Sequence, residues 1–254
     1  MADHRDKETI AGFAKGLRVI EAFDATSPRL SISEVSARTG LQRATARRCL
    51  LTLAAGGYAE FDGKYFRLTP RLLRLGHAYL ASTPLPRLVQ PYLEQLSQET
   101  DESCSASILE GTDIVYVARA SHRRVMSIGL NVGSRLPAYC SSMGRVLLAA
   151  LPERQLSGLI EATPLVQHTP RTLTDPAALL VEIATVRRDG FAVIDQELEI
   201  GLRSIAVPLH DASGRVVAAI NVGAQAERVA IETMRSSFLP RMHVIQQELA
   251  QLLS

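Results

Sequence analysis

The chain has 254 residues, 46% of them hydrophobic, with 28 Lys and Arg against 26 Asp and Glu. This length and apolar content suffice for two domains of ordinary size, each with a buried core. The sequence contains no run of eighteen apolar residues that could span a membrane, and its charged first residues are unlike a signal peptide. We therefore expect a cytoplasmic protein without a membrane partner.

The residue types that usually carry catalysis or metal binding show no informative pattern. Cys49, Cys104 and Cys140 are odd in number and far apart, which argues against a disulfide framework or a CxxC metal site. The sequence also lacks GxSxG, GxxxxGK[ST], HExxH and a GxGxxG motif after a strand. Cys140 with His168 or His210 would make a nucleophile pair, but a lone cysteine beside serines is usually structural. We expect no enzyme activity, no metal and no cofactor.

The basic residues concentrate near the start of the chain. Residues 1–83 hold 13 Lys and Arg against 8 Asp and Glu, whereas residues 84–254 hold 15 against 18. Between Arg38 and Arg74 there are eight basic residues and only two acidic ones, Glu60 and Asp62. This excess is typical of a surface that meets phosphates, although an ordinary solvated basic surface is the simpler alternative.

The same region carries a helix-turn-helix pattern. Residues 13–23 have apolar side chains at helical spacing. Ser31 to Glu34 fits a capping box, which predicts the start of a short second helix. Gly40 supplies the positive φ of a sharp corner, and a third helix is expected from Gln42 to about Gly56. Two helices joined by a tight glycine turn are typical of DNA-binding domains.

The third helix has an apolar face and a basic face. Ala46, Cys49, Leu50 and Leu53 share one side, which leaves the arginines on the other side for the major groove of DNA. After this helix, residues 58–68 predict a hairpin around an Asp-Gly corner, as in a wing. The expected DNA contacts are Gln42, Arg43, Ala44, Thr45, Arg47 and Arg48 in the helix, and Lys64 at the wing tip.

The expected domain organisation has three parts. Residues 1–69 form a winged helix-turn-helix domain, 70–85 a linker helix with the boundary, and 86–254 an effector-binding and oligomerisation domain. The proline-rich stretch 83–86 marks the boundary, and a helix is expected over 71–80.

The third part alternates strand and helix patterns, which predicts an α+β domain with an antiparallel sheet flanked by helices. Helices are expected over 88–100 and from about 227 onward, where Pro240 should kink or interrupt the helix. The expected strands are 104–109, 114–118, 126–130, 191–194, 205–209 and 216–222.

Several separated stretches together resemble the IclR family of bacterial transcriptional regulators, along essentially the whole chain. They are GFAKGLRVIE (12–21), the helix pair over 31–53, LPAYCSSMGRVLLA (136–149) and DQELEIGLRSIAVP (195–208). The sequences of residues 121–129 and 136–139 are most similar to those of the family branch that controls the β-ketoadipate pathway.

The resemblance implies a GAF-like effector domain, assembly as a homodimer or homotetramer, and double-stranded operator DNA as partner. It also implies a small carboxylated effector such as protocatechuate, p-hydroxybenzoate or β-ketoadipate. Residues that match the family's effector pocket are Tyr139, Cys140, Ser141, Ser142, Met143, Asp195, Ser204, Asn221 and Gly223. Relatives often have cysteine where this chain has Ser204.

A buried carboxylate needs a cation or several donors. Arg123 and Arg124, near Met126, are the candidates, although each arginine would serve equally well as a surface charge. Asp195 would equally well order its loop. Two other functions stay open: an α+β enzyme with a basic N-terminal module, and a DNA-binding protein that ignores small molecules.

Overall fold

The computed structural model describes residues 9–24, 26–121 and 129–253. The chain separates into two compact units, Met1–Ser82 and Thr83–Ser254. Within the described ranges, no helix is long and apolar enough to cross a membrane. The three-part division expected from the sequence stays a prediction.

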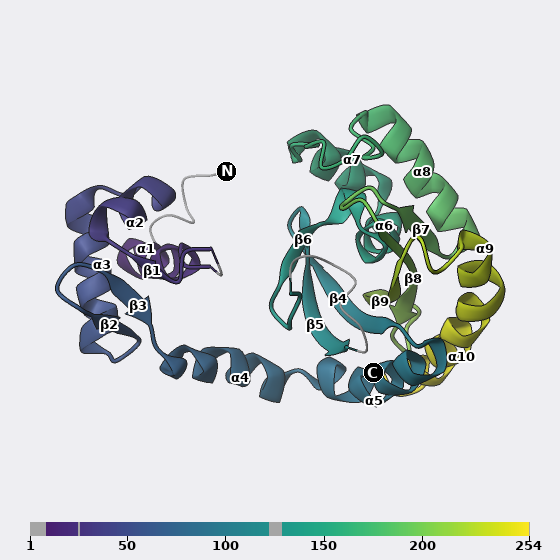
Figure 1. Ribbon diagram of the computed structural model, residues 1–254, viewed down its shortest axis with the longest axis horizontal. Coiled ribbons are helices and arrows are strands. Elements are labelled where there is room, and N and C mark those ends of the chain that lie inside the picture. Colours follow the sequence, from purple (N-terminus) through teal and green to yellow (C-terminus); the bar gives the residue numbers. More distant parts are fainter. Residues whose placement is uncertain (1–8, 25, 122–128, 254) are drawn as a thin grey trace. The chain divides into compact units, whose positions relative to one another are not determined.

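The first unit contains the helices α1 to α3 and a small sheet, followed by α4 (Figure 1). Its sheet has the order β1-β3-β2, and all of its pairings are antiparallel. Its elements are α1 (Ala11–Glu21), β1 (Arg29–Leu30), α2 (Ile32–Thr39), α3 (Arg43–Ala55), β2 (Ala59–Phe61), β3 (Phe66–Leu68), a 3-10 turn (Pro70–Leu72) and α4 (Leu73–Ser82).

The expected local signals shape this unit. The Ser31 hydroxyl accepts from the Glu34 amide at 3.4 Å, and the Glu34 carboxylate accepts from the Ser31 amide at 2.7 Å. This reciprocal pair satisfies free amides at the start of α2. Gly40 ends α2 with φ of 67°, a left-handed conformation that favours glycine. The capping box and the glycine corner are confirmed.

The hairpin of the wing turns as its Asp-Gly corner predicts. The Asp62 carboxylate accepts from the amides of Lys64 at 2.9 Å and Tyr65 at 2.7 Å. β1 was not expected; its two residues pair with Arg67 and Phe66 of β3. A two-residue strand shows too little alternation to be recognised from sequence.

The second unit is built on one six-stranded antiparallel sheet of order β6-β5-β4-β9-β8-β7. Its strands are β4 (Ser103–Glu110), β5 (Asp113–Ala120), β6 (Arg135–Pro137), β7 (Ala192–Asp195), β8 (Leu202–His210) and β9 (Val216–Gln225). Its helices are α5 (Pro84–Thr100), α6 (Ser142–Ala149), α7 (Glu153–Ala162), α8 (Pro176–Asp189), α9 (Ile231–Thr233) and α10 (Leu239–Ala250), with a 3-10 turn at Ala138–Cys140. This arrangement confirms the α+β class.

The expected strand 126–130 is the exception. Gly129 and Leu130 belong to no strand, and residues 126–128 lie outside the described ranges. Antiparallel β6 instead pairs with β5, with Leu136 opposite Ile114. Glycine at 129 and again at 133 disfavours a strand there, because glycine has low strand propensity.

Helices cover both faces of the sheet (Figure 1). α5 and α10 pack on one face, where Cys104, Ala106, Ile220 and Val222 are buried. α6 packs on the other face, against β4, β8 and β9, and α8 packs on α6. The second face is only partly apolar, since it also carries Ser105 and Asn221.

The last helical segment is interrupted, as Pro240 predicts. A π-helical turn at Met234–Phe238 precedes α10, and Pro240 lies in the first turn of α10. Proline lacks the amide hydrogen that a continuous helix needs at this point. The apolar side chains Met234, Met242 and Ile245 pack into the core on the α5 side of the sheet.

Candidate functional site

The second unit encloses a cavity of about 330 Å³ between the sheet and α6. Its walls come from the sheet, from the turn before α6, from residues 129–136 and from the β7–β8 loop. The lining residues are Ser103, Ser105, Tyr116, Arg119, Ser121, Gly129, Leu130, Asn131, Leu136, Cys140, Ser141, Ser142, Met143, Ile194, Leu198, Leu202, Ser204, Asn221 and Gly223. A volume of this size fits a small organic ligand.

The sheet wall carries a row of polar residues in register. Ser105 of β4 lies opposite Arg119 of β5 on one side and opposite Asn221 of β9 on the other. The Arg119 guanidinium donates to Ser105 Oγ at 3.0 Å and to Ser121 Oγ at 2.9 Å. Among the described lining residues Arg119 is the only ionisable cation, and none is acidic. The row therefore presents one positive charge to the cavity.

Asn221 is the polar side chain of this row that stays unpaired. Its residue is 9% exposed, and its Oδ1 is buried without a hydrogen-bond partner within the described part of the chain. Leaving a buried acceptor unpaired costs about 1–3 kcal/mol. A ligand that supplies a donor would remove this cost.

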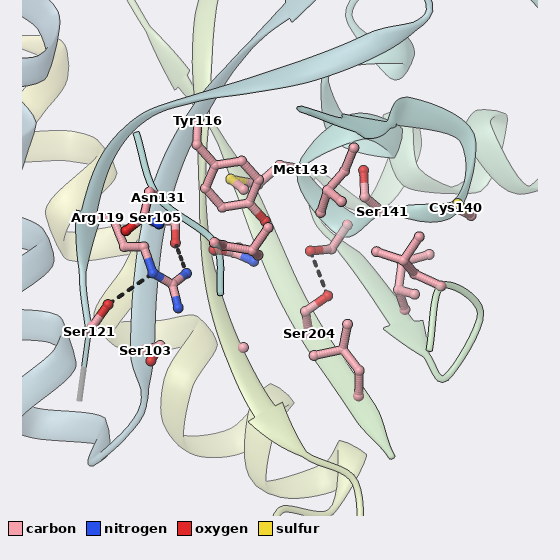
Figure 2. A pocket seen from close by; sticks show the side chains of 18 of the residues that line it. Ser103, Ser105, Tyr116, Arg119, Ser121, Asn131, Cys140, Ser141, Met143 and Ser204 are labelled. Carbon is pink, nitrogen blue, oxygen red and sulfur yellow. Dashed lines mark hydrogen bonds between the residues drawn. The ribbon is translucent and has the colours of Figure 1, made fainter. Parts of the chain in front are cut away.

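α6 contributes Ser142 and Met143 to the opposite wall of the cavity. Ser204 Oγ of β8 donates to Ser142 Oγ at 2.9 Å, and Ser107 Oγ lies 3.2 Å from Met143 Sδ. Figure 2 shows Tyr116 between the Arg119 end of the cavity and the Ser204 end. The cavity therefore has a cationic end and a neutral hydroxyl end.

Burial keeps the other ionisable lining groups neutral. Desolvation raises the pKa of the Tyr116 hydroxyl to about 12 and the pKa of the Cys140 thiol to about 12. A thiol with such a pKa is not an activated nucleophile. In the described ranges no group of His, Cys, Asp and Glu could hold a metal ion.

Seven residues expected in the effector pocket line this cavity, and two described ones, Tyr139 and Asp195, do not. Arg123, Arg124 and Met126 lie outside the described residues. Tyr139 is buried beside the cavity, and its hydroxyl donates to the Val166 carbonyl at 2.6 Å. The expected residues in the lining are Cys140, Ser141, Ser142, Met143, Ser204, Asn221 and Gly223.

Asp195 faces cations rather than the cavity. Its carboxylate pairs with Arg171 at 2.5 Å and with Arg203 at 2.7 Å. The structure thus places Asp195 where it orders the β7–β8 loop, which was one of the two roles expected for it. Of that loop, Leu198 reaches the cavity lining.

Sequence reasoning missed Arg119 and the serines of β4. The segment Ser103-Cys104-Ser105-Ala106-Ser107 alternates hydroxyl and apolar side chains. Strand alternation places its hydroxyls on one face, so this pattern was a usable signal for a polar sheet wall. Arg119 carried no comparable signal.

The first unit presents the expected DNA-binding residues on its surface. On α3, Arg43, Arg47 and Arg48 are exposed, and none of them makes an ion pair with an acid of the described chain. Gln42 and Ala44 are also exposed, and Thr45 is half-buried. Ala46 and Leu50, on the opposite side of α3, are fully buried.

Two other arginines of this unit form ion pairs. Arg38 pairs with Asp24 at 2.9 Å, and Arg67 pairs with Glu60 at 2.6 Å. Lys64, exposed in the wing turn, lies 5.0 Å from the centre of the Tyr65 ring. α3 and the wing tip therefore carry positive charge that no acid of the described chain pairs, and phosphates of DNA would meet it there.

A winged helix with unpaired arginines, joined to a unit with a small polar cavity, defines the class of ligand-responsive DNA-binding regulators. Residues 13–63 match the IclR helix-turn-helix domain, and residues 77–250 match the bacterial transcriptional regulator IclR C-terminal domain. The chain belongs to the IclR family of transcriptional regulators. The family resemblance and the fold class expected from the sequence are both confirmed.

The similarity to known regulatory proteins extends over nearly the whole chain. The Pca regulon regulatory protein of Pseudomonas putida is 47% identical over 249 residues, 98% of this chain and 86% of that protein. The p-hydroxybenzoate hydroxylase transcriptional activator of Acinetobacter baylyi is 38% identical over 253 residues, 98% of this chain and 93% of that protein.

Two similar solved structures contain aromatic acids. One is an IclR homolog from Microbacterium hydrocarbonoxydans complexed with 4-hydroxybenzoate, with a TM-score of 0.76, 27% identity, and coverage of 95% of this chain and 100% of that one. The other is a double mutant of the PobR inducer-binding domain from Acinetobacter complexed with 3-hydroxybenzoic acid. It has a TM-score of 0.63 and 32% identity, and it covers 66% of this chain and 98% of that one.

Proposed function

We propose that this regulator controls genes of aromatic-acid catabolism, those of the β-ketoadipate pathway, in response to a small carboxylated effector. The observation that carries the proposal is the cavity with the Arg119 guanidinium at one end and neutral hydroxyls at the other. The names of its relatives support the pathway, since they regulate a Pca regulon and p-hydroxybenzoate hydroxylase. Candidate effectors are protocatechuate, p-hydroxybenzoate and β-ketoadipate.

The effector site consists of the cavity residues, with Arg119 as the partner of the carboxylate. A guanidinium binds a carboxylate through parallel charge-assisted hydrogen bonds, which offsets the cost of desolvating the acid. Ser141, Ser142 and Ser204 supply neutral hydrogen-bonding groups. Leu136, Leu198 and Leu202 supply apolar contact for the body of the effector.

The DNA site consists of α3 and the wing tip. Arg43, Arg47 and Arg48 contact bases or phosphates, and Lys64 contacts the backbone. The remaining contacts come from Gln42, Ala44 and Thr45 at the start of α3. The protein acts in the cytoplasm as a homodimer or homotetramer on a pseudo-palindromic operator, and it acts by binding rather than by catalysis.

Regulation requires that the effector bind more tightly to one arrangement of the two winged helices than to another. We expect the segment 71–80, which contains most of α4, to transmit this difference. The test is the operator affinity at fixed salt with and without saturating effector, on an operator selected by the protein from genomic fragments. Identical affinity, DNA geometry and transcription in both states would refute regulation by the effector.

Thermal unfolding identifies the effector. At a concentration of 100 times its Kd, a ligand of the folded state adds about 2.7 kcal/mol of stability. For a unit of this size that corresponds to a rise in Tm of roughly 5–10 °C. A rise with protocatechuate, p-hydroxybenzoate or β-ketoadipate supports the proposal, and no rise with any of them removes the effector assignment.

Two variants separate the alternatives. Arg47→Ala together with Arg48→Ala should weaken operator binding and flatten its salt dependence, by about 0.9 in the slope for each lost phosphate contact. The same variant should keep the ligand-induced rise in Tm. Arg154→Ala, an exposed arginine of α7, is the matched control and should change neither quantity. If the protein were an enzyme, it would convert one of the candidate acids to a product, and this turnover would survive the loss of DNA binding.

A further inference from the structure

We propose that the second unit has another small-molecule site, at the C-terminal ends of α6 and α8, which binds a small carboxylate with an apolar body. The site is a cavity of about 300 Å³ that shares no lining residue with the cavity described above. This inference goes beyond the proposed function and does not depend on it.

Three basic side chains line this second cavity from three different elements. Arg187 comes from α8, His210 from the end of β8 and His243 from α10. The whole lining comes from the segments 146–150, 186–190, 208–216 and 243–246, which the structure describes without a gap, and no acidic side chain is part of it. Donors that converge without an acid favour an anionic ligand.

The acids nearest in sequence to the lining are paired with other arginines. The Asp189 carboxylate pairs with Arg188 at 2.7 Å, and the Asp211 carboxylate pairs with Arg215 at 2.8 Å. Neither acid therefore competes with a ligand for the basic side chains of the second cavity.

The guanidinium of Arg187 is fixed in position and keeps a donor group free. Its Nε donates to the Ala149 carbonyl at 2.7 Å, and its Nη2 donates to the Leu151 carbonyl at 2.8 Å. These bonds hold Arg187 against the end of α6. Within the described part of the chain its Nη1 forms no hydrogen bond. A donor that is already held in place loses little freedom when a ligand binds.

The two histidines supply further donors. Gln246 Nε2 donates to the Pro208 carbonyl at 2.7 Å and lies 3.5 Å from His210 Nδ1. His243 lies one helical turn before Gln246 on α10, and its imidazole has no hydrogen-bond partner among the described residues. A neutral imidazole donates from one ring nitrogen, and a protonated one donates from both. Both histidines can therefore donate to a carboxylate.

The remaining lining of the second cavity is mostly apolar. It includes Val146 of α6, Val186 of α8 and Val216 of β9. A bare inorganic anion would leave these side chains in contact with water, whereas an organic acid would bury its body against them. The lining as a whole therefore fits an organic carboxylate.

The test uses cyclohexanecarboxylate as the probe. It is titrated into the full chain at neutral pH, and the imidazole signals of His210 and His243 are followed by ¹H–¹⁵N NMR spectroscopy. We expect both signals to shift saturably. Cyclohexanecarboxamide, which keeps the ring and lacks the charge, should bind more weakly by about tenfold or more. Inorganic phosphate, which lacks the apolar body, should also bind more weakly by about tenfold or more. Absence of a saturable shift, or comparable affinity for the amide or for phosphate, would overturn the proposal.

Variants show which cavity the probe occupies. This control is needed because α6 and β8 line both cavities, so that His210 could respond to a ligand in the first one. Arg187→Met removes a donor of the second cavity, and Ala150→Leu adds volume to its wall. Each should weaken the probe by about tenfold or more. Arg188→Met, an exposed arginine outside the lining, is the matched control and should leave the affinity unchanged.

The two variants also protect the test against a folding defect. Arg187→Met removes the bonds to the end of α6, so Ala150→Leu decides the question if that variant does not fold. Unchanged affinity for the probe in the folded variants would place the probe outside the second cavity and overturn the proposal. Neither result bears on operator binding or on the effector, so the proposed function is tested separately.

Discussion

The buried ion pair between Arg145 of α6 and Glu197 of the β7–β8 loop gives a sharp prediction about the second unit. The Arg145 residue is 2% exposed, and its Nη2 lies 2.5 Å from Glu197 Oε2. Its Nε donates to the Tyr139 carbonyl at 3.0 Å. Glu182 is the next acid, 3.8 Å away and 39% exposed at its side chain. The pair therefore joins the turn before α6 to the loop that carries Leu198.

We predict that Glu197→Ala destabilises the second unit by about 3–5 kcal/mol, because it leaves the guanidinium buried with only a distant, partly exposed partner. Glu197→Gln should cost less, since the amide oxygen still accepts from Arg145. Replacing both residues, Arg145→Met with Glu197→Met, leaves no buried charge. The double variant should therefore cost clearly less than the sum of the two single replacements.

The assay is urea unfolding of the full chain followed by circular dichroism, because the sequence contains no tryptophan. With a slope of about 2–3 kcal/mol/M, Glu197→Ala should lower the midpoint of the second unit by about 1–2 M. Any separate transition of the first unit serves as the internal control and should not move. A loss below about 1 kcal/mol, or a double variant as costly as the sum, would refute the reasoning.

Two further predictions concern close packing and thiol chemistry. Gly144→Ala should cost about 2 kcal/mol or more in the same assay, since its Cβ would lie 2.1 Å from the Ala138 carbonyl oxygen; Gly158→Ala, with open space around it, should be neutral or stabilising and is the control. Burial raises the pKa of the Cys140 thiol to about 12, so almost no thiolate exists at pH 8 and Cys140 should resist alkylation there. The half-exposed Cys49 should react. Mass spectrometry of the labelled protein checks the order, and equal labelling of both cysteines would contradict it.

The DNA-binding unit could be predicted from sequence because its signals are local. The capping box at Ser31 and Glu34, the glycine corner at Gly40 and the Asp62 turn each act over two to four residues. The division of α3 into a buried and an exposed side follows from helical periodicity alone. β1 was missed because its structure depends on pairing with β3, 36 or more residues away.

The cavity of the second unit could be predicted only in part. The serines before and within α6 came from the family resemblance, and they do line the cavity. The partners of Asp195 could not be predicted, because Arg171 lies 24 residues earlier and its contact depends on how the intervening helix packs. Arg123 and Arg124, expected to hold the carboxylate, lie outside the described residues and stay a prediction, whereas Arg119 lines the cavity.

The amino-acid sequence by itself determined the helix-turn-helix, the capping of α2 and the alternation of polar and apolar residues in β4, since each depends on side chains close together in the chain. The tertiary structure decided which residues meet in the cavity. Tyr116 and Arg119 are three residues apart, so regular strand alternation would send them to opposite faces of the sheet. A β-bulge shifts the register between β4 and β5 from Ala106 opposite Ala118 to Ser107 opposite Tyr116. This extra residue turns both side chains to the cavity, and only the pairing of two strands can specify it.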